Sequence, residues 1–435
     1  MNAEITVIGG GLAGSEAAYY LAKRGRKVRL VDIKPKSFSP AHKSGNYGEL
    51  VCSNSLKSND VYGNACGTLK EEMRILGSMI IACADATRVP AGAALAVDRD
   101  AFSALITEKL RKTGNIEFVC EEITDVDLDG NVIIATGPLT TPRLCEFIKK
   151  ITGDGFYFYD AAAPIVSGDS VDMNYAFVAD RYGEAGKGDY INCPIDKDGY
   201  KAFYRELVNA KRVELHDFEN MKVFEGCMPV EVMAARGEDT LRFGPLKPAG
   251  LDDPKTGRWP YACLQLRKED EHGERYNMVG FQTNLLFPEQ KRVFSMFPAL
   301  KNAEFLRYGV MHKNTFINSP KTLNSDYSLK GRRTVFFAGQ ITGVEGYVES
   351  ASSGLWAAIN LDRKLNGKEP LAADCRTVIG ALAAYVAAPN ADFQPMNANY
   401  GVLKPLGVTP KKKSDKKRLL SERAIETIKE IKEQL

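Results

Sequence analysis

The stretch Ile5-Thr-Val-Ile-Gly9-Gly10-Gly11-Leu12-Ala13-Gly14 decides the fold of this chain. Its apolar residues 5–8 predict a β-strand that runs through a Gly-x-Gly-x-x-Gly turn into a helix over 12–24. In such a turn Gly9 permits the tight bend, Gly11 lets the backbone approach phosphate oxygens, and Gly14 lets the helix pack closely on the strand. Because a helix N-terminus also attracts anions, residues 9–14 predict a site for a dinucleotide pyrophosphate.

An acidic residue supports this prediction. Residues 27–32 predict a second strand ending in Asp32, which follows Gly14 by about 20 residues, the usual spacing for an acid that hydrogen-bonds a ribose hydroxyl. The glycine pattern alone is a weak signal, and a glycine-rich turn without a ligand is the alternative. The strands and helix around the turn favour a nucleotide-binding unit.

Two more predicted strands end in glycine-rich turns. The run Asn131-Val-Ile-Ile-Ala-Thr136-Gly137 predicts a buried parallel strand, and its Ala-Thr-Gly end is typical of two-dinucleotide-binding flavoproteins. Far along the chain, residues 334–347 repeat the strand-to-glycine pattern, and a helix is predicted from 351 to 361. We expect this last segment to contribute Gly339, Gln340, Gly343, Gly346 and Tyr347 to the same site, which the three segments together identify as a site for FAD.

These segments predict an α/β fold with a Rossmann-like FAD-binding domain of the two-dinucleotide-binding flavoprotein type and an inserted α+β substrate domain. We expect residues 1–140 to form the first part of the FAD domain and residues 141–325 to form the inserted substrate or RNA domain. Residues 326–435 then complete the FAD domain and add a basic stretch and a C-terminal helix. A chain of 435 residues is long enough for two or three domains.

The composition argues against several classes of protein. The net charge of +3 is too small to indicate a nucleic-acid binder, so any basic surface must be local. Nine cysteines without Cys-x-x-Cys spacing fit neither a disulfide framework nor a zinc site. No signal peptide or membrane-spanning apolar run is evident. We therefore expect a cytoplasmic protein without a metal or a membrane partner, and the sequence leaves its oligomeric state open.

The C-terminal region carries a local basic cluster. A helix is predicted around Ile425, Ile428 and Ile431, and the cluster precedes it. The cluster is either a solvated linker ahead of a docking helix or a contact for RNA phosphates. Its members are Lys404, Lys411, Lys412, Lys413, Lys416, Lys417 and Arg418.

Two cysteines stand in distinctive local sequences. Cys52 is followed by Ser53 and Asn54, whose hydroxyl and amide groups suit a thiolate. Cys227 lies between a glycine and a nearby proline, in Gly226-Cys227-Met-Pro229. From these residues alone, a reactive thiol and a small buried hydrophobic residue are equally good interpretations of each.

Several longer blocks of sequence are specific enough to resemble one family. They include Gly48-Glu-Leu-Val-Cys52-Ser-Asn-Ser-Leu-Lys57, Ala84-Asp-Ala-Thr-Arg88-Val-Pro-Ala-Gly92, Gly237-Glu-Asp-Thr-Leu-Arg242-Phe-Gly-Pro245, Gly309-Val-Met-His312-Lys-Asn-Thr-Phe-Ile-Asn318-Ser-Pro320 and Gly339-Gln-Ile-Thr-Gly-Val-Glu-Gly-Tyr347. From the first strand to about residue 360, the chain resembles the folate- and FAD-dependent tRNA (uracil-5-)-methyltransferases, the TrmFO family. That family is related to the GidA-type tRNA-modifying flavoproteins.

The resemblance implies formation of 5-methyluridine in the T-loop of tRNA. It implies methylenetetrahydrofolate as carbon donor, reduced FAD as methylene carrier and hydride donor, and NADH or NADPH as reductant. It also implies that Cys227 adds to carbon 6 of uracil, since a thiolate addition there makes carbon 5 nucleophilic. Cys52 then protects the carbon unit or removes the carbon-5 proton, and the sequence leaves open an exchange of roles between the two cysteines.

Four weaker candidates share these blocks. His312 is a candidate for stabilising enolate charge or contacting folate, and Arg88, Arg242 and Lys313 are candidates for binding folate carboxylates or RNA phosphates. A lone histidine is more often structural, and most arginine and lysine side chains simply lie on the surface.

Three other functions compete with this interpretation. The first is the same folate- and FAD-dependent methylation of a uridine in ribosomal RNA. The second is an NAD(P)H-dependent flavin oxidoreductase without an RNA substrate, and the third is a non-catalytic, flavin-stabilised RNA-binding protein. Cys52 and Cys227 argue against the last two, because neither needs a thiol that adds to uracil.

Overall fold

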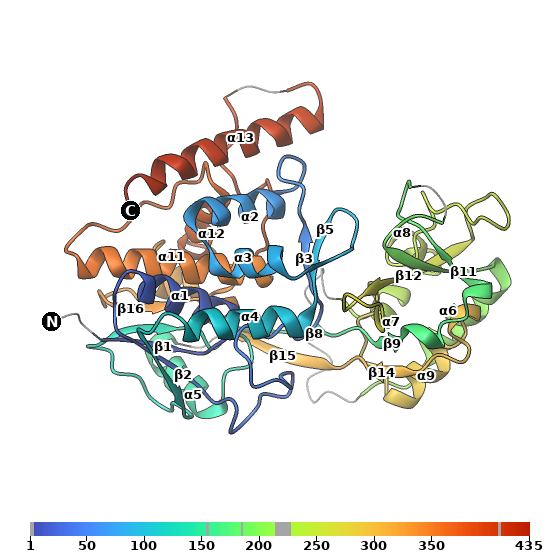
Figure 1. Cartoon of the computed structure of the whole chain (residues 1–435), viewed down its shortest axis with the longest axis horizontal. Helices are drawn as coiled ribbons and strands as arrows, with labels where there is room; N and C mark the ends of the chain where they lie inside the picture. Colours follow the sequence, from blue (N-terminus) through green and yellow to red (C-terminus); the bar gives the residue numbers. More distant parts are fainter. Residues whose placement is uncertain (1–3, 154–155, 184–185, 214–227, 408–409) are drawn as a thin grey trace.

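The structure, a computed structural model, describes residues 4–153, 156–183, 186–213, 228–407 and 410–435. Figure 1 shows two units, one built around a parallel sheet and one around an antiparallel sheet. We call them the parallel-sheet unit and the antiparallel-sheet unit.

Five parallel strands organise the parallel-sheet unit, in the order β16-β7-β1-β2-β6. Strands buried on both faces by helices need nearly continuous apolar sequence, and the short runs predicted here have it. This sheet confirms the Rossmann-like prediction. The strands are β1 (Ile5–Ile8), β2 (Val28–Asp32), β6 (Ile116–Cys120), β7 (Asn131–Ile134) and β16 (Val335–Phe337).

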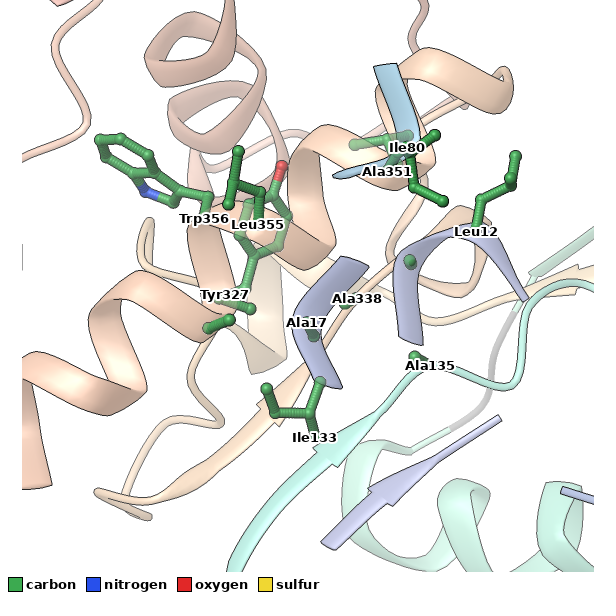
Figure 2. Packing of buried hydrophobic residues seen from close by; sticks show 14 of the residues in the cluster. Leu12, Ala17, Ile80, Ile133, Ala135, Tyr327, Ala338, Ala351, Leu355 and Trp356 are labelled. Carbon is green, nitrogen blue, oxygen red and sulfur yellow. The ribbon is translucent and has the colours of Figure 1, made fainter. Parts of the chain in front are cut away.

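Two helices that are far apart in the sequence pack together beside this sheet. Helix α1 (Leu12–Lys23) follows β1, and α11 (Tyr347–Leu365) follows β16. Gly354 permits their close approach, because a Cβ there would lie 2.2 Å from the carbonyl oxygen of Ala13. Figure 2 shows Ala17 of α1 in the same buried core as Trp356 of α11.

Helix α11 begins earlier than the sequence predicted. Its first residue is Tyr347 rather than a residue near 351, because the chain leaves the glycine-rich turn at Gly346, with φ +120°, directly into the helix. Tyr347 is therefore fixed on the first turn of a long helix. The other helices of this unit are α2 (Ala65–Leu76), α3 (Met79–Ala86), α4 (Arg99–Arg111), α5 (Pro142–Thr152), α10 (Ser319–Thr322), α12 (Val378–Ala387) and α13 (Lys413–Lys432).

The antiparallel-sheet unit has its own buried core, which extends from Val166 to Ala303. Its strands lie in the order β10-β11-β12-β13-β9-β14. They are β9 (Ile165–Ser167), β10 (Phe177–Val178), β11 (Tyr190–Ile195), β12 (Ala262–Lys268), β13 (Arg275–Met278) and β14 (Phe305–Arg307). The helices of this unit are α6 (Lys197–Asn209), α7 (Val230–Ala234), α8 (Thr240–Phe243) and α9 (Phe287–Phe294).

Two smaller sheets lie where the units meet (Figure 1). An antiparallel pair, β8 (Phe156–Ala161) and β15 (Met311–Phe316), carries the chain out of the parallel-sheet unit and back. A three-stranded sheet contains β3 (Ser55–Ser58), β4 (Arg88–Val89) and β5 (Ala94–Val97). The domain limits at residues 140 and 325 stay a prediction.

The C-terminal helix differs from its predicted extent. Helix α13 begins at Lys413, so most of the basic cluster lies within its first turns rather than before it. Its buried residues Leu420, Ala424 and Ile428 belong to the core of the parallel-sheet unit, and the helix packs against α2. In the described parts of the chain, no helix combines the length and apolar character required to cross a membrane.

Candidate active site

A cavity lies where the parallel strands β1, β2, β7 and β16 end. Its empty volume is about 1090 Å³, including the open mouth. The structure brings the three predicted segments together around it. From them the lining includes Gly9, Gly10, Gly11, Leu12, Ala13, Asp32, Thr136, Gly137, Gly339, Gln340 and Tyr347.

The glycine turn is shaped as a cradle for a ligand. A Cβ on Gly14 would lie 1.8 Å from the oxygen of Gly9, so this glycine permits the close packing of helix and strand. A Cβ on Gly11 would meet nothing within 4 Å, which means that this position faces open space. Gly11 is also the N-cap of α1, and the first amides of a helix lack partners within it. The turn therefore fits a pyrophosphate group.

Asp32 braces the same turn. One carboxylate oxygen accepts a hydrogen bond from the Gly10 amide at 2.6 Å, and the other accepts one from the Lys34 amide at 2.8 Å. Each carboxylate oxygen has a second lone pair, and Asp32 lines the cavity. The side chain can thus hold the turn and accept a hydrogen bond from a ribose hydroxyl. The residues present fit the FAD that the sequence predicts.

Three predicted glycines lie apart from this first cavity. Gly14 lies behind the turn, against Gly9. Gly343, with φ +86°, lines neither of the two cavities described here, and a Cβ there would lie 2.5 Å from the ring of Phe393. Gly346 lines the second cavity.

This second cavity adjoins the first and has an empty volume of about 1120 Å³, including its mouth. The two share Val51, Pro138, Leu139, Gln340 and Tyr347 in their linings. Polar side chains are frequent in the second cavity, where the lining includes Cys52, Ser53, Ser55, Lys57, Gln282, Asn314, Glu345, Glu349 and Asn397. A molecule bound there would lie next to one bound in the first cavity.

Cys52 and Tyr347 meet at the boundary of the two cavities. The Tyr347 oxygen accepts hydrogen bonds from the amides of Cys52, at 2.9 Å, and Ser53, at 3.3 Å. The same oxygen lies 2.9 Å from the Cys52 sulfur. Burial, followed by the charge of Cys52, raises the pKa of the Tyr347 phenol well above its usual value. The phenol therefore stays protonated, and because its oxygen already accepts two hydrogen bonds, its hydrogen is directed to the sulfur.

An ion pair lines the second cavity on another side. Lys57 Nζ lies 3.1 Å from Glu349 Oε1, and the Glu349 side chain is completely buried. Burial alone would lower the pKa of Lys57, but the Glu349 carboxylate outweighs this effect and the pKa is raised. Lys57 has φ +63°, a left-handed conformation that is uncommon for a residue other than glycine. The cavity thus keeps a fixed ammonium group.

Sequence reasoning missed a group of charged residues behind the Cys52 loop. Arg99, Arg267 and Arg307 all donate hydrogen bonds to residues 50–54, and Glu269 binds Arg99 at 2.5 Å. These residues come from α4, from the end of β12 and from β14. No local motif marks them, because only the folded chain brings them together.

The remaining predicted residues lie elsewhere. Cys227 is outside the described residues. Arg242 stacks over the Tyr261 ring at 3.8 Å and pairs with Asp239 at 2.7 Å, and Arg88 is exposed on β4. His312 and Lys313 belong to β15, which pairs with β8. Among the described residues, no group of three or more His, Cys, Asp or Glu side chains is placed to hold a metal ion.

Comparisons with known proteins agree with this architecture. Residues 4–369 match the family described as glucose inhibited division protein A. A protein of Acetivibrio thermocellus named methylenetetrahydrofolate–tRNA-(uracil-5-)-methyltransferase TrmFO is 56% identical over 99% of this chain and 98% of its own. A Bacillus licheniformis protein with the same name is 52% identical over the full length of both chains.

A solved structure shares the fold. That of Aquifex aeolicus GidA superposes with a TM-score of 0.72, covering 99% of this chain and 73% of the GidA chain at 16% identity. At that identity the likeness concerns the fold alone. It confirms the predicted fold class, a Rossmann-like domain with an inserted α+β domain.

Proposed function

The chain belongs to the TrmFO family, and on that premise we propose that it methylates carbon 5 of a uridine in tRNA with a one-carbon unit from methylenetetrahydrofolate. The observation that carries the proposal is the position of Cys52 and Tyr347 at the boundary of two adjoining cavities. One cavity fits a flavin dinucleotide, and the other has room for the reacting groups of folate and uracil.

The first cavity is the proposed FAD site. The Gly9–Gly14 turn and the N-terminus of α1 would hold the pyrophosphate, and Asp32 would hold the ribose. Thr136, Gly137, Gly339 and Gln340 would line the path toward Tyr347. When bound, reduced FAD supplies the hydride and carries the carbon unit; we propose NADH or NADPH as its reductant.

Cys52 is proposed to act on a proton or on the carbon unit beside the flavin. Its sulfur accepts a hydrogen bond from the Tyr347 hydroxyl, an arrangement that favours the thiolate form. Its loop is also fixed by the Tyr347 contacts to two successive backbone amides. Tyr347 therefore orients the sulfur at the cavity boundary.

Cys227 is proposed to add to carbon 6 of the target uracil. Addition of a thiolate forms the carbon–sulfur bond and moves an electron pair to carbon 5 and the carbon-4 oxygen. Lys57 lines the same cavity as Cys52 and can face the developing negative charge. We further propose the T-loop uridine as the target and the cytoplasm as the compartment.

The test is a methylation assay with purified protein, methylenetetrahydrofolate, FAD and NADPH, with 5-methyluridine measured by mass spectrometry. We expect tRNA to be methylated, Cys52→Ala and Cys227→Ala to be inactive while retaining flavin, and ribosomal RNA to remain unmodified. Methylation of ribosomal RNA instead would identify a different substrate. NADPH oxidation without methylation of either RNA would contradict the proposed function.

A further inference from the structure

Three guanidinium groups converge on the loop that carries Cys52. Arg99 donates to the carbonyl of Leu50 at 2.8 Å, and Arg307 donates to the carbonyl of Val51 at 2.6 Å. Arg267 donates to the Ser53 hydroxyl at 2.8 Å and to the Asn54 side-chain oxygen at 3.0 Å. The cations thus bind the residues on both sides of Cys52.

These arginines come from both units of the fold. Arg99 belongs to α4 of the parallel-sheet unit. Cys52 is part of the same unit. Arg267 belongs to β12 and Arg307 to β14, both in the antiparallel-sheet unit. Two of the three cations at the loop are therefore supplied by the second unit.

The group contains more positive than negative charge. Glu269 pairs with Arg99 at 2.5 Å. In the described part of the chain, no carboxylate lies within 4.0 Å of the guanidinium group of Arg267 or Arg307. Arginine stays protonated in proteins, and Arg267 is buried while Arg307 is half-buried. A cation held away from water is costly unless an anion lies near it. An anion close to both groups would offset that cost.

Cys52 is placed to be this anion. Burial lowers the pKa of both Arg267 and Arg307, while the charges of Glu269 and Cys52 both act on each arginine in the opposite direction. On the cavity side, the Tyr347 phenol donates to the sulfur. The other charged groups that line the cavity are Lys57, Glu345 and Glu349.

The arginines act from behind the loop. None of the three lines either cavity, so a molecule bound in a cavity would touch Cys52 and not these side chains. They are positioning residues rather than catalytic residues.

We propose that Arg267 and Arg307, together with Arg99, hold Cys52 as a thiolate, so that contact with the antiparallel-sheet unit activates a thiol of the parallel-sheet unit. The relevance of this thiolate to catalysis rests on the proposed function. Its existence can be tested without any substrate.

The experiment measures the alkylation rate of Cys52 by iodoacetamide in the full-length, flavin-bound protein between about pH 5.5 and 9.5. Mass spectrometry of the Cys52 peptide separates this thiol from the other cysteines. Because the thiolate is the reacting species, we expect a half-maximal rate at least one pH unit below the value of about 8.5 for a free cysteine. A wild-type midpoint near 8.5 would overturn the proposal without any variant.

Two substitutions at one position separate charge from hydrogen bonding. Arg307→Gln keeps an amide donor for the Val51 carbonyl but loses the positive charge. We expect the alkylation rate of Cys52 at pH 7 to fall roughly ten-fold in this variant, because the pH of the half-maximal rate rises by about one unit. Arg307→Lys keeps the charge and should stay close to the wild type. The control is Arg292→Gln on α9, where an exposed arginine pairs with Glu289.

Only flavin-bound protein recovered from gel filtration is compared. The proposal would be overturned if the pH profile of Cys52 alkylation in Arg307→Gln matched that of the wild type. It would also be overturned if the profile of Arg307→Lys matched that of Arg307→Gln. Methylation of tRNA is measured on the same preparations. Methylation by Cys52→Ala would contradict the role of Cys52 in the proposed function, whereas an ordinary alkylation profile in an active wild-type enzyme would contradict only the arginine proposal.

Discussion

The hydroxyl oxygen of Tyr347 lies 2.9 Å from the sulfur of Cys52, although 295 positions separate the two residues in the sequence. The two backbone amides that bind the same oxygen fix the direction of its hydrogen. The first residue of α11 thus holds the thiol at the boundary between the proposed flavin site and the second cavity.

Removal of the Tyr347 hydroxyl should lower the rate of catalysis and leave the folded, flavin-bound state largely intact. A hydrogen bond to a charged group contributes about 1.5–3 kcal/mol, so we expect Tyr347→Phe to lower the single-turnover methylation rate roughly 10- to 150-fold. Flavin content, read from the absorbance spectrum, should remain. The control is Tyr385→Phe, which removes a hydroxyl bonded to the Gln394 carbonyl at 2.7 Å. Equal rates in the two variants would rule out this role for Tyr347.

The glycines of the turn should separate ligand binding from folding. A side chain at Gly11 enters open space at the helix N-terminus, so Gly11→Val should fold and lose FAD. Gly14→Ala should instead destabilise the fold, because its Cβ would lie 1.8 Å from the Gly9 oxygen. Flavin content and thermal unfolding of the FAD-free protein measure the two effects. Full flavin content in Gly11→Val would show that the pyrophosphate lies elsewhere.

Part of this site could be predicted from the sequence and part could not. Local sequence patterns mark the glycine turn, Asp32 and the strand ends at Thr136 and Gly339. This is because the geometry of a turn and the position of a helix N-terminus depend on residues that are close in the sequence. The Tyr347 contact and the three arginines carry no such pattern, since tertiary packing alone brings them to Cys52. Likewise, the helix over Tyr347–Leu365 starts where one glycine ends the turn, a boundary that residue periodicity does not define.

A buried acid should make stability depend on pH. Glu72 accepts hydrogen bonds from the amides of Val378, at 2.7 Å, and Ile379, at 2.8 Å, at the start of α12. Burial raises the pKa of Glu72 from 4.5 to about 8. Between these pH values the unfolded chain loses the proton first, so the stabilising contribution of this group is complete below about pH 4.5 and is lost as pH rises toward 8.

The variant Glu72→Gln cannot ionise and isolates this contribution. We expect the free energy of unfolding of the wild type, relative to Glu72→Gln, to decrease between pH 5 and pH 8.5. Urea unfolding of both proteins at the two pH values measures it. A difference between the two proteins that is the same at both pH values would be inconsistent with the raised pKa.

The basic cluster at the start of α13 should bind tRNA phosphates. Lys411, Lys412 and Lys413 are exposed. Each lysine that no longer neutralises a phosphate should reduce the slope of log affinity against log salt concentration by roughly 0.7–0.9, so replacing all three with glutamine should flatten the slope. The control replaces Arg143, Lys149 and Lys150, which are exposed on α5. Figure 1 shows α5 and α13 on opposite sides of the parallel-sheet unit. An unchanged slope in the α13 variant would leave the cluster as a solvated segment.

The most direct measurement uses a tRNA with 5-fluorouridine at the target position, analysed on denaturing gels. The fluorine at carbon 5 replaces the proton that must leave before the cysteine is released, so the adduct is trapped. The account therefore predicts a covalent protein–RNA species in the wild type and none in flavin-loaded Cys227→Ala. Cys52→Ala should stop methylation of ordinary tRNA and still form some of the covalent species, because its role follows or accompanies the addition. Near-normal methylation by a folded, flavin-loaded Cys227→Ala enzyme would contradict the account.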